Sequence, residues 1–176
     1  KMLEEPAPGC VFILTAASTE SLLPTIASRA QQLHVQPIKL SDASKQLSSS
    51  YGQKQIENAW NLSQGSAGLM LALLKDDKDH PLKKAIEDAK NYLRKDRYER
   101  ILASEALSKD KNQLRLFLDA LLKLLAALHS SSVNKANKTQ QKKLIASRKL
   151  VYKLHEALDA NVSPKLITLE LSLNLL

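Results

Sequence analysis

Cysteine and aromatic residues are scarce in this sequence. Cys10 is the only cysteine among 176 residues, which excludes an internal disulfide and a zinc site built from cysteines within the chain. Since a lone cysteine commonly packs as a small apolar side chain, we expect Cys10 to be buried. Aromatic residues make up 4% of the chain, whereas hydrophobic residues together make up 44%. An apolar fraction dominated by leucine and alanine favours packed helices over a sandwich or barrel, so we expect a mainly α protein.

Long apolar runs and metal-ligand patterns are also missing. No stretch reaches the roughly 18 uninterrupted apolar residues of a membrane span, and no basic segment with an apolar core and cleavage site opens the chain. We therefore expect a soluble, cytoplasmic protein with no membrane partner. The histidines are scattered, with no second histidine four residues on and no cysteine partner, which argues against a metal site. They are His34, His80, His129 and His155.

Acidic residues are absent from one long stretch of the second half. Residues 1–74 hold five basic and five acidic side chains, whereas residues 75–176 hold 21 and 13, so this second part carries the whole net charge of +8. Between Asp119 and Glu156 there are eight lysines or arginines and no acid. Such a bias suits phosphates or an acidic partner, but a solvated face has the same composition. Our candidate nucleic-acid contacts are Lys135, Lys138, Lys142 and Lys143.

The first 38 residues mix extended and helical patterns. "KMLEEPAPG" is typical of the last turn of a helix that Pro6 and Pro8 stop. The apolar run "VFIL" at residues 11–14 suits a strand covered on both faces, but the sequence offers no neighbouring strands for it. Residues 20–28 follow a helical pattern, and "QQLHVQ" then alternates with period two.

From residue 39 onward helical patterns predominate. Ser41 predicts the start of a helix that runs to about residue 51, residues 55–62 form another, and Ser66 caps a third. "KDDKDHP" predicts a linker and a domain boundary, with Asp79 as the cap of the next helix.

The C-terminal part begins with a strongly amphipathic helix. Leucine and phenylalanine recur at i, i+3, i+4 and i+7 over residues 114–128. The polar residues 129–141 predict a flexible basic loop, and residues 150–158 mark the next helix. Ser163 with Pro164 begins the last segment, which fits both an alternating strand and a helical stripe. We predict a helix, because a lone strand would have no sheet to join.

Three motifs near the start resemble one protein family. "LEEP", "FILTAAS" and "LLPTIASRA" are similar in text and spacing to the end of the ATPase module in bacterial DNA polymerase III clamp-loader subunits. The following helices, ending in "NVSPKLITLELSLNLL", are similar to the lid and collar of those subunits, most of all the delta-prime type. The resemblance implies the end of an AAA+ α/β core at residues 1–38, a three-helix lid at 39–77 and a helical oligomerisation collar at 78–176.

The resemblance also implies a role for Arg29. In the family, the arginine of a Ser-Arg-Cys motif is presented across a subunit boundary to the nucleotide of a neighbour. This arginine corresponds to Arg29, with Ser28 beside it and Ala30 in place of the cysteine. A planar, permanently charged guanidinium can stabilise charge on a transferring γ-phosphate, which makes Arg29 a catalytic residue in trans. The alternative is a surface arginine that caps the last carbonyls of the preceding helix.

Several positions depart from the ATPase members of the family. The first sensor should be a polar residue, but Ala16 and Ala17 stand there, flanked by Thr15 and Ser18. The second sensor normally reads Gly-Ser-x-Arg, whereas residues 65–68 read Gly-Ser-Ala-Gly. The sequence has no G-x-x-x-x-G-K-[ST] loop either. We therefore expect that the chain binds no nucleotide or other cofactor and does not hydrolyse ATP on its own.

The resemblance thus implies a fragment of a non-hydrolysing clamp-loader subunit that serves the replicative DNA polymerase, whose polymerase activity lies elsewhere. Its implied partners are the gamma/tau and delta subunits through the collar, and the sliding clamp and primer-template DNA within the complex. Two alternatives stay open. One is an ATPase subunit of the gamma/tau type, and the other is a free-standing basic helical module that binds nucleic acid.

Overall fold

The computed structural model describes residues 3–5, 7–16, 19–77, 80–134 and 138–175. The protein is 70% helical and contains no strand among these residues, which confirms the prediction of a mainly α protein. The chain divides into two compact units, Lys1–Gln36 and Pro37–Leu176.

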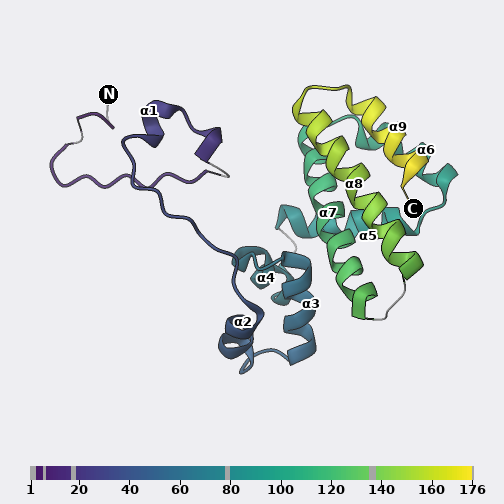
Figure 1. Ribbon diagram of the computed structural model, residues 1–176, viewed down its shortest axis with the longest axis horizontal. Coiled ribbons are helices and arrows are strands. Elements are labelled where there is room, and N and C mark those ends of the chain that lie inside the picture. Colours follow the sequence, from purple (N-terminus) through teal and green to yellow (C-terminus); the bar gives the residue numbers. More distant parts are fainter. Residues whose placement is uncertain (1–2, 6, 17–18, 78–79, 135–137, 176) are drawn as a thin grey trace. The chain divides into compact units, whose positions relative to one another are not determined.

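The first unit has little regular structure. Within its described residues the regular elements are the 3₁₀ turn η1, Thr19–Ser21, and the single-turn helix α1, Pro24–Ala27 (Figure 1). The helix predicted over residues 20–28 is therefore split. Pro24 lacks the N–H group that a continuous helix would require there, but it is well suited to the first turn of a new one.

The strand predicted at residues 11–14 is not formed in this structure. Val11 and Ile13 are 85% and 87% exposed, and Val35 in the alternating segment is 94% exposed. A strand needs a neighbour to pair its backbone groups, and the described residues of this unit supply none. Cys10 precedes the same uncovered segment and is exposed, so the expectation of a buried thiol was wrong.

Three short helices open the second unit. Ile56 is fully buried at the middle of their small apolar cluster, and Trp60 packs against it while its indole N–H donates to the Ile38 carbonyl at 2.7 Å. The helix predicted from the cap Ser41 to about residue 51 instead has Lys39 as its N-cap, begins at Leu40 and ends at Leu47. Ser66 precedes the third helix, as predicted. The helices are α2, Leu40–Leu47; α3, Gln53–Ser63; and α4, Ala67–Leu74.

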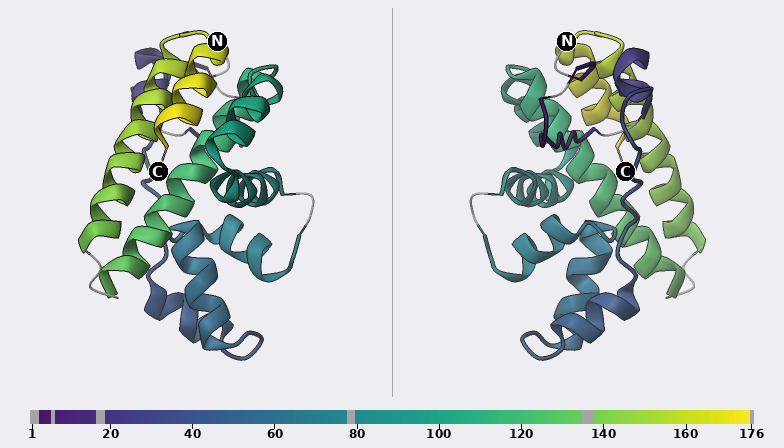
Figure 2. Two further views of the ribbon diagram at one scale, coloured as in Figure 1. Left: turned by 90° about the vertical axis from the view of Figure 1, so that its right-hand side faces the viewer. Right: turned by 90° about the vertical axis from the view of Figure 1, so that its left-hand side faces the viewer.

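Five further helices complete the second unit, and α7 is the one around which the others pack. It contacts α5 and α8 most extensively, and α3 also packs against it (Figure 2). The leucines at its predicted inward positions, Leu114, Leu118, Leu121 and Leu125, are fully buried. The helices are α5, Pro81–Arg94; α6, Arg97–Leu107; α7, Lys111–Asn134; α8, Lys138–Asp159; and α9, Pro164–Asn174.

Helix ends also differ from the prediction in the C-terminal part of the chain. Most of the loop expected at residues 129–141 is helical, because α7 continues to Asn134 and α8 begins at Lys138. Ser130 and Ser132 donate their hydroxyls to carbonyls of the preceding turn, so these polar side chains are satisfied within the helix. His80 is the N-cap of α5, and Asp79, the cap that the sequence suggested, lies outside the described residues. The last segment is helical, as predicted.

The segment Lys111–Val133 of α7 is long and apolar enough, by length and composition, to cross a membrane. Its inward leucines are fully buried against neighbouring helices of the bundle. Packing in the bundle core therefore accounts for the apolar composition of this helix.

A buried arginine joins the ends of three helices. Arg100 on α6 is only 6% exposed and donates to the carbonyls of Tyr92, Leu93 and Leu175, at 3.2, 3.1 and 2.6 Å. The guanidinium carbon also lies 5.6 Å from the centroid of the Tyr92 ring. Carbonyls at the C-terminal ends of α5 and α9 carry partial negative charge, so they compensate the buried cation without a carboxylate.

The α7 core gives the first prediction. Leu121→Ala should lower the free energy of unfolding by about 2–5 kcal/mol, because the side chain is fully buried and its removal leaves a cavity. Leu128→Ala, on the same helix at a side chain that is 39% exposed, is the matched control and should cost much less. Urea melts of the whole chain measure both. Equal losses in the two variants would contradict the assignment of the buried face.

The second prediction concerns Tyr92. Burial raises the pKa of its phenol, while the hydrogen bond with Ser172 and the charge of Arg100 act in the opposite direction. The Tyr92 and Ser172 hydroxyls lie 3.0 Å apart. A folded-state pKa above the unfolded value of about 10 means that the stabilisation is complete below pH 10 and is lost as the pH rises through the folded pKa. Stability should therefore fall more steeply above pH 10 in the wild type than in Tyr92→Phe. If the free energy of unfolding fell with pH at the same rate in both proteins, the pKa of Tyr92 would not be raised in the folded state.

Candidate functional site

Arg29 lies directly after α1, beyond the C-cap residue Ser28. Its Nη1 atom donates to the Thr25 carbonyl at 2.8 Å, and its backbone N–H donates to the Ile26 carbonyl at 3.1 Å. The Ser28 hydroxyl also donates to Thr25 O, at 3.4 Å. In this structure, therefore, Arg29 caps the last carbonyls of α1, as in the structural alternative that the sequence left open.

A second contact ties Arg29 to the "LEEP" motif. Arg29 Nη2 lies 3.0 Å from Glu4 Oε1, and the two side chains are 40% and 56% exposed. The sequence patterns did not indicate this ion pair. Two of the motifs that carry the family resemblance are thereby linked by an ion pair within the first unit.

These contacts hold the guanidinium weakly. An exposed ion pair contributes only about 0–1 kcal/mol, because solvent screens it and both side chains lose entropy. Thr25 and Glu4 engage one N–H group each of the five that a guanidinium carries. The side chain can therefore leave Glu4 at small cost, and its planar donor fork suits a phosphate or carboxylate.

At the expected first-sensor position, Ala16 offers no polar side chain. Ala16 is exposed coil, and its methyl group cannot hydrogen-bond a phosphate; Thr15 before it is exposed as well. Ala17 and Ser18 lie outside the described residues.

The second sensor region is shaped by Gly65. This residue has φ of +79°, and a Cβ atom there would lie 2.8 Å from the Ile38 carbonyl oxygen, so a side chain is excluded. The Gly65 carbonyl accepts a hydrogen bond from Ile38 N–H at 2.9 Å. This bond joins the residues before α2 to the turn between α3 and α4. At Gly68, by contrast, a Cβ would meet nothing within 4 Å. The lack of an arginine at position 68 is therefore not a consequence of crowding in this structure.

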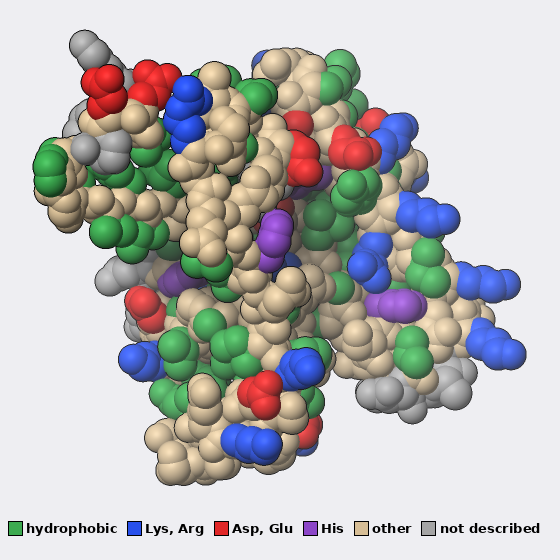
Figure 3. All heavy atoms as spheres, turned by 60° about the vertical axis from the view of Figure 1, so that its left-hand side comes forward, with side chains coloured by type: hydrophobic (Ala, Val, Ile, Leu, Met, Phe, Trp, Pro, Cys, Tyr) green, Lys and Arg blue, Asp and Glu red, His purple; other side chains and the backbone are tan. Residues whose placement is uncertain are grey.

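The candidate nucleic-acid lysines occupy the start of α8. Lys138, Lys142 and Lys143 are exposed, and the first two lie one turn apart on the same face; Lys135 lies outside the described residues. Figure 3 shows Lys and Arg side chains along the right-hand edge of that view, over the α7–α8 pair. The positive charge of a lysine interacts unfavourably with the positive end of the helix dipole, which lies at the N-terminus. These lysines therefore do not stabilise α8 through its dipole.

One charged cluster was missed by the sequence interpretation. His155 on α8 lies 3.0 Å from an Asp119 carboxylate oxygen and 3.5 Å from one of Asp159, and Arg115 pairs with Asp159 as well. The signal was present as i, i+4 spacing within each helix, at 115 and 119 and at 155 and 159. It joins the start of α7 to the end of α8. Within the described part of the chain, no group of three or more His, Cys, Asp or Glu side chains is arranged to hold a metal ion.

Comparison with known proteins gives one result that bears on this site. Residues 1–39 match the model of the family described as "DNA polymerase III, delta subunit". No curated protein and no solved structure matches the chain. The matched segment contains Glu4, α1 and Arg29, whereas the helices from α2 onward lie outside it. The match supports a protein related to the DNA polymerase III clamp loader, without singling out the delta-prime subunit.

Proposed function

We propose that this chain is a non-hydrolysing clamp-loader subunit of the delta-prime type, which supplies Arg29 to the ATP site of a neighbouring subunit. In this role it helps to assemble the loader ring that places a sliding clamp on primed DNA. It acts in the cytoplasm, binds no cofactor of its own, and contacts gamma/tau and delta subunits through helices α5 to α9.

One observation carries the proposal: Arg29 lies in the segment that matches the family, at the end of a single helical turn, and only weak contacts restrain it. A trans-acting arginine must be positioned by its own subunit yet remain available to a phosphate outside it. The capping bond to Thr25 supplies the positioning, and the partial exposure of the guanidinium supplies the access. A buried arginine such as Arg100 could not act in this way.

The sensor regions support the non-hydrolysing part of the proposal. Sensors in ATPases read the γ-phosphate through side-chain hydrogen-bond donors, and the side chains of Ala16 and Gly68 offer none. Gly68 has open space around it, so steric crowding does not explain why this chain has no arginine there. The absence of the second-sensor arginine favours a subunit that assists ATP hydrolysis by a neighbour over one that hydrolyses ATP itself.

The third prediction tests Arg29 in the assembled loader. Arg29→Ala should reduce ATP turnover at the one site that this subunit faces by about 10³-fold or more, since an arginine supplied in trans stabilises transition-state charge by that order. Arg29→Lys should restore only part of the rate, because an ammonium cannot reproduce the planar donor fork. The measurement is clamp- and DNA-stimulated ATPase activity, with assembly checked by size exclusion.

Two control variants separate this role from local structure. Arg97→Ala removes another exposed arginine, at the start of α6, and should leave turnover unchanged. Glu4→Gln removes the carboxylate charge that holds Arg29 and should also leave turnover near the wild-type level, since the pair is weak. If Arg29→Ala assembles normally and every ATP site turns over at the wild-type rate, the proposed role is wrong.

A further inference from the structure

An open groove of about 340 Å³ runs along the outer face of the α7–α8 pair. Leu122 contributes from α7, and the remaining lining comes from α8 as Ile145, Arg148, Lys149 and Tyr152. These α8 positions are spaced i, i+3, i+4 and i+7, so they form one stripe along the helix. Ile145 is 39% exposed and Tyr152 is 59% exposed, which leaves an apolar strip uncovered within the second unit.

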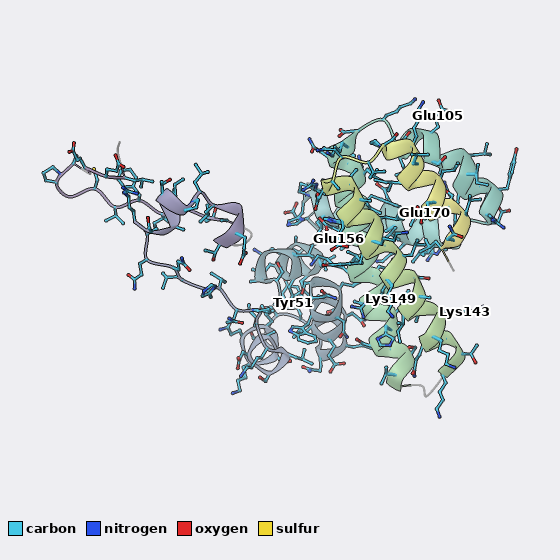
Figure 4. The ribbon with its side chains drawn as sticks, turned by 45° about the horizontal axis from the view of Figure 1, so that its top comes forward. Tyr51, Glu105, Lys143, Lys149, Glu156 and Glu170 are labelled. Atoms are coloured by element: carbon cyan, nitrogen blue, oxygen red, sulfur yellow. The ribbon has the colours of Figure 1, made fainter. Side chains whose placement is uncertain are left out.

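The rim of this groove is positively charged. Arg148 and Lys149 flank the apolar strip, and Lys142 precedes it by one turn of α8. Within the described residues, no carboxylate forms an ion pair with Arg148 or Lys149. The nearest acids along α8 come after Tyr152, at Glu156 and Asp159. Figure 4 shows Lys143, Lys149 and Glu156 in this order along the helix.

We propose that this groove binds an acidic amphipathic helix of a partner protein. Such a helix would lay its apolar face on Leu122, Ile145 and Tyr152, while its acidic residues meet Arg148 and Lys149. The groove lining combines an exposed tyrosine, two apolar side chains and an arginine, which is a composition typical of interface anchors. The proposal rests on this groove alone and is independent of the role of Arg29.

Two other occupants fit the groove less well. A nucleic-acid strand would meet the positive rim, but the groove offers one aromatic platform, whereas single strands stack on successive aromatic side chains. A second copy of this chain, paired through the same face about a two-fold axis, would bring Arg148 and Lys149 against their own equivalents. Like charges brought together in this way disfavour association.

The experiment is a selection from a displayed library of peptides of about 16 residues, roughly four helical turns, against the whole chain. The enriched peptides should be acidic and should carry apolar residues at i, i+3 or i+4, and i+7. Fluorescence anisotropy of one enriched peptide then gives its affinity. Ile145→Ser and the double variant Arg148→Glu with Lys149→Glu should each weaken binding by about tenfold or more.

Matched controls use equivalent side chains on other faces. Tyr98→Ala removes a tyrosine that is 69% exposed on α6, and Lys109→Glu reverses an exposed charge, and neither should change the affinity. Circular dichroism melts check that every variant is folded. Enriched peptides that are neutral or basic, or that bind the groove variants as well as the wild type, would overturn the proposal.

Two further arms test the other occupants. Single-stranded DNA that binds the chain and loses affinity in the Ile145→Ser and Tyr152→Ser variants would identify the groove as a nucleic-acid site and contradict the proposal. Self-association in sedimentation experiments that the same variants abolish would identify a second copy as the occupant and would contradict it as well.

Discussion

Burial of one face of α7 is the interaction on which the rest of the second unit depends. Leu114, Leu118, Leu121 and Leu125 are removed entirely from solvent, and each contributes about 1.5–3 kcal/mol relative to an exposed side chain. The helices α5 and α8 pack on this face, and α3 joins it from the three-helix segment. Because α8 is fixed in this way, Ile145 and Tyr152 lie outward beside Leu122, and the basic groove follows from the same packing.

Repetitive apolar spacing made this part of the fold predictable, whereas single polar contacts did not. The stripe over residues 114–128 predicted α7 and most of its inward face, although Leu122 and Leu128 of the same stripe are not fully buried. Ser163 with Pro164 predicted the start of α9. The role of Arg100 could not be predicted in the same way. Its acceptors are backbone carbonyls at positions 92, 93 and 175, which no pattern of side-chain types reveals. Ser130 and Ser132 were misleading for a related reason, since their hydroxyls donate to carbonyls within the helix that these residues were expected to end.

At the candidate site, too, the sequence predicted which residue matters but not which groups it contacts. The sequence predicted Arg29 as the residue of interest, and the structure adds where its donors point. They engage Thr25 and Glu4, the latter being 25 positions away along the chain. The carboxylate of Glu4 was not predicted as a partner, because a residue pair so distant has no spacing signal. The uncovered Val11, Ile13 and Val35 illustrate the opposite limit: their pattern indicates strands, but pairing depends on segments that the described residues of this unit do not supply.

The most direct measurement of the proposed role is site-specific photo-crosslinking from position 29. A photo-reactive amino acid replaces Arg29 in the assembled loader, a second sample carries it at Arg97, and adducts are mapped by mass spectrometry. Our account predicts that position 29 crosslinks to the neighbouring ATPase subunit at residues around its nucleotide, while position 97 does not. Adducts confined to this chain, or to surfaces away from any nucleotide, would contradict it.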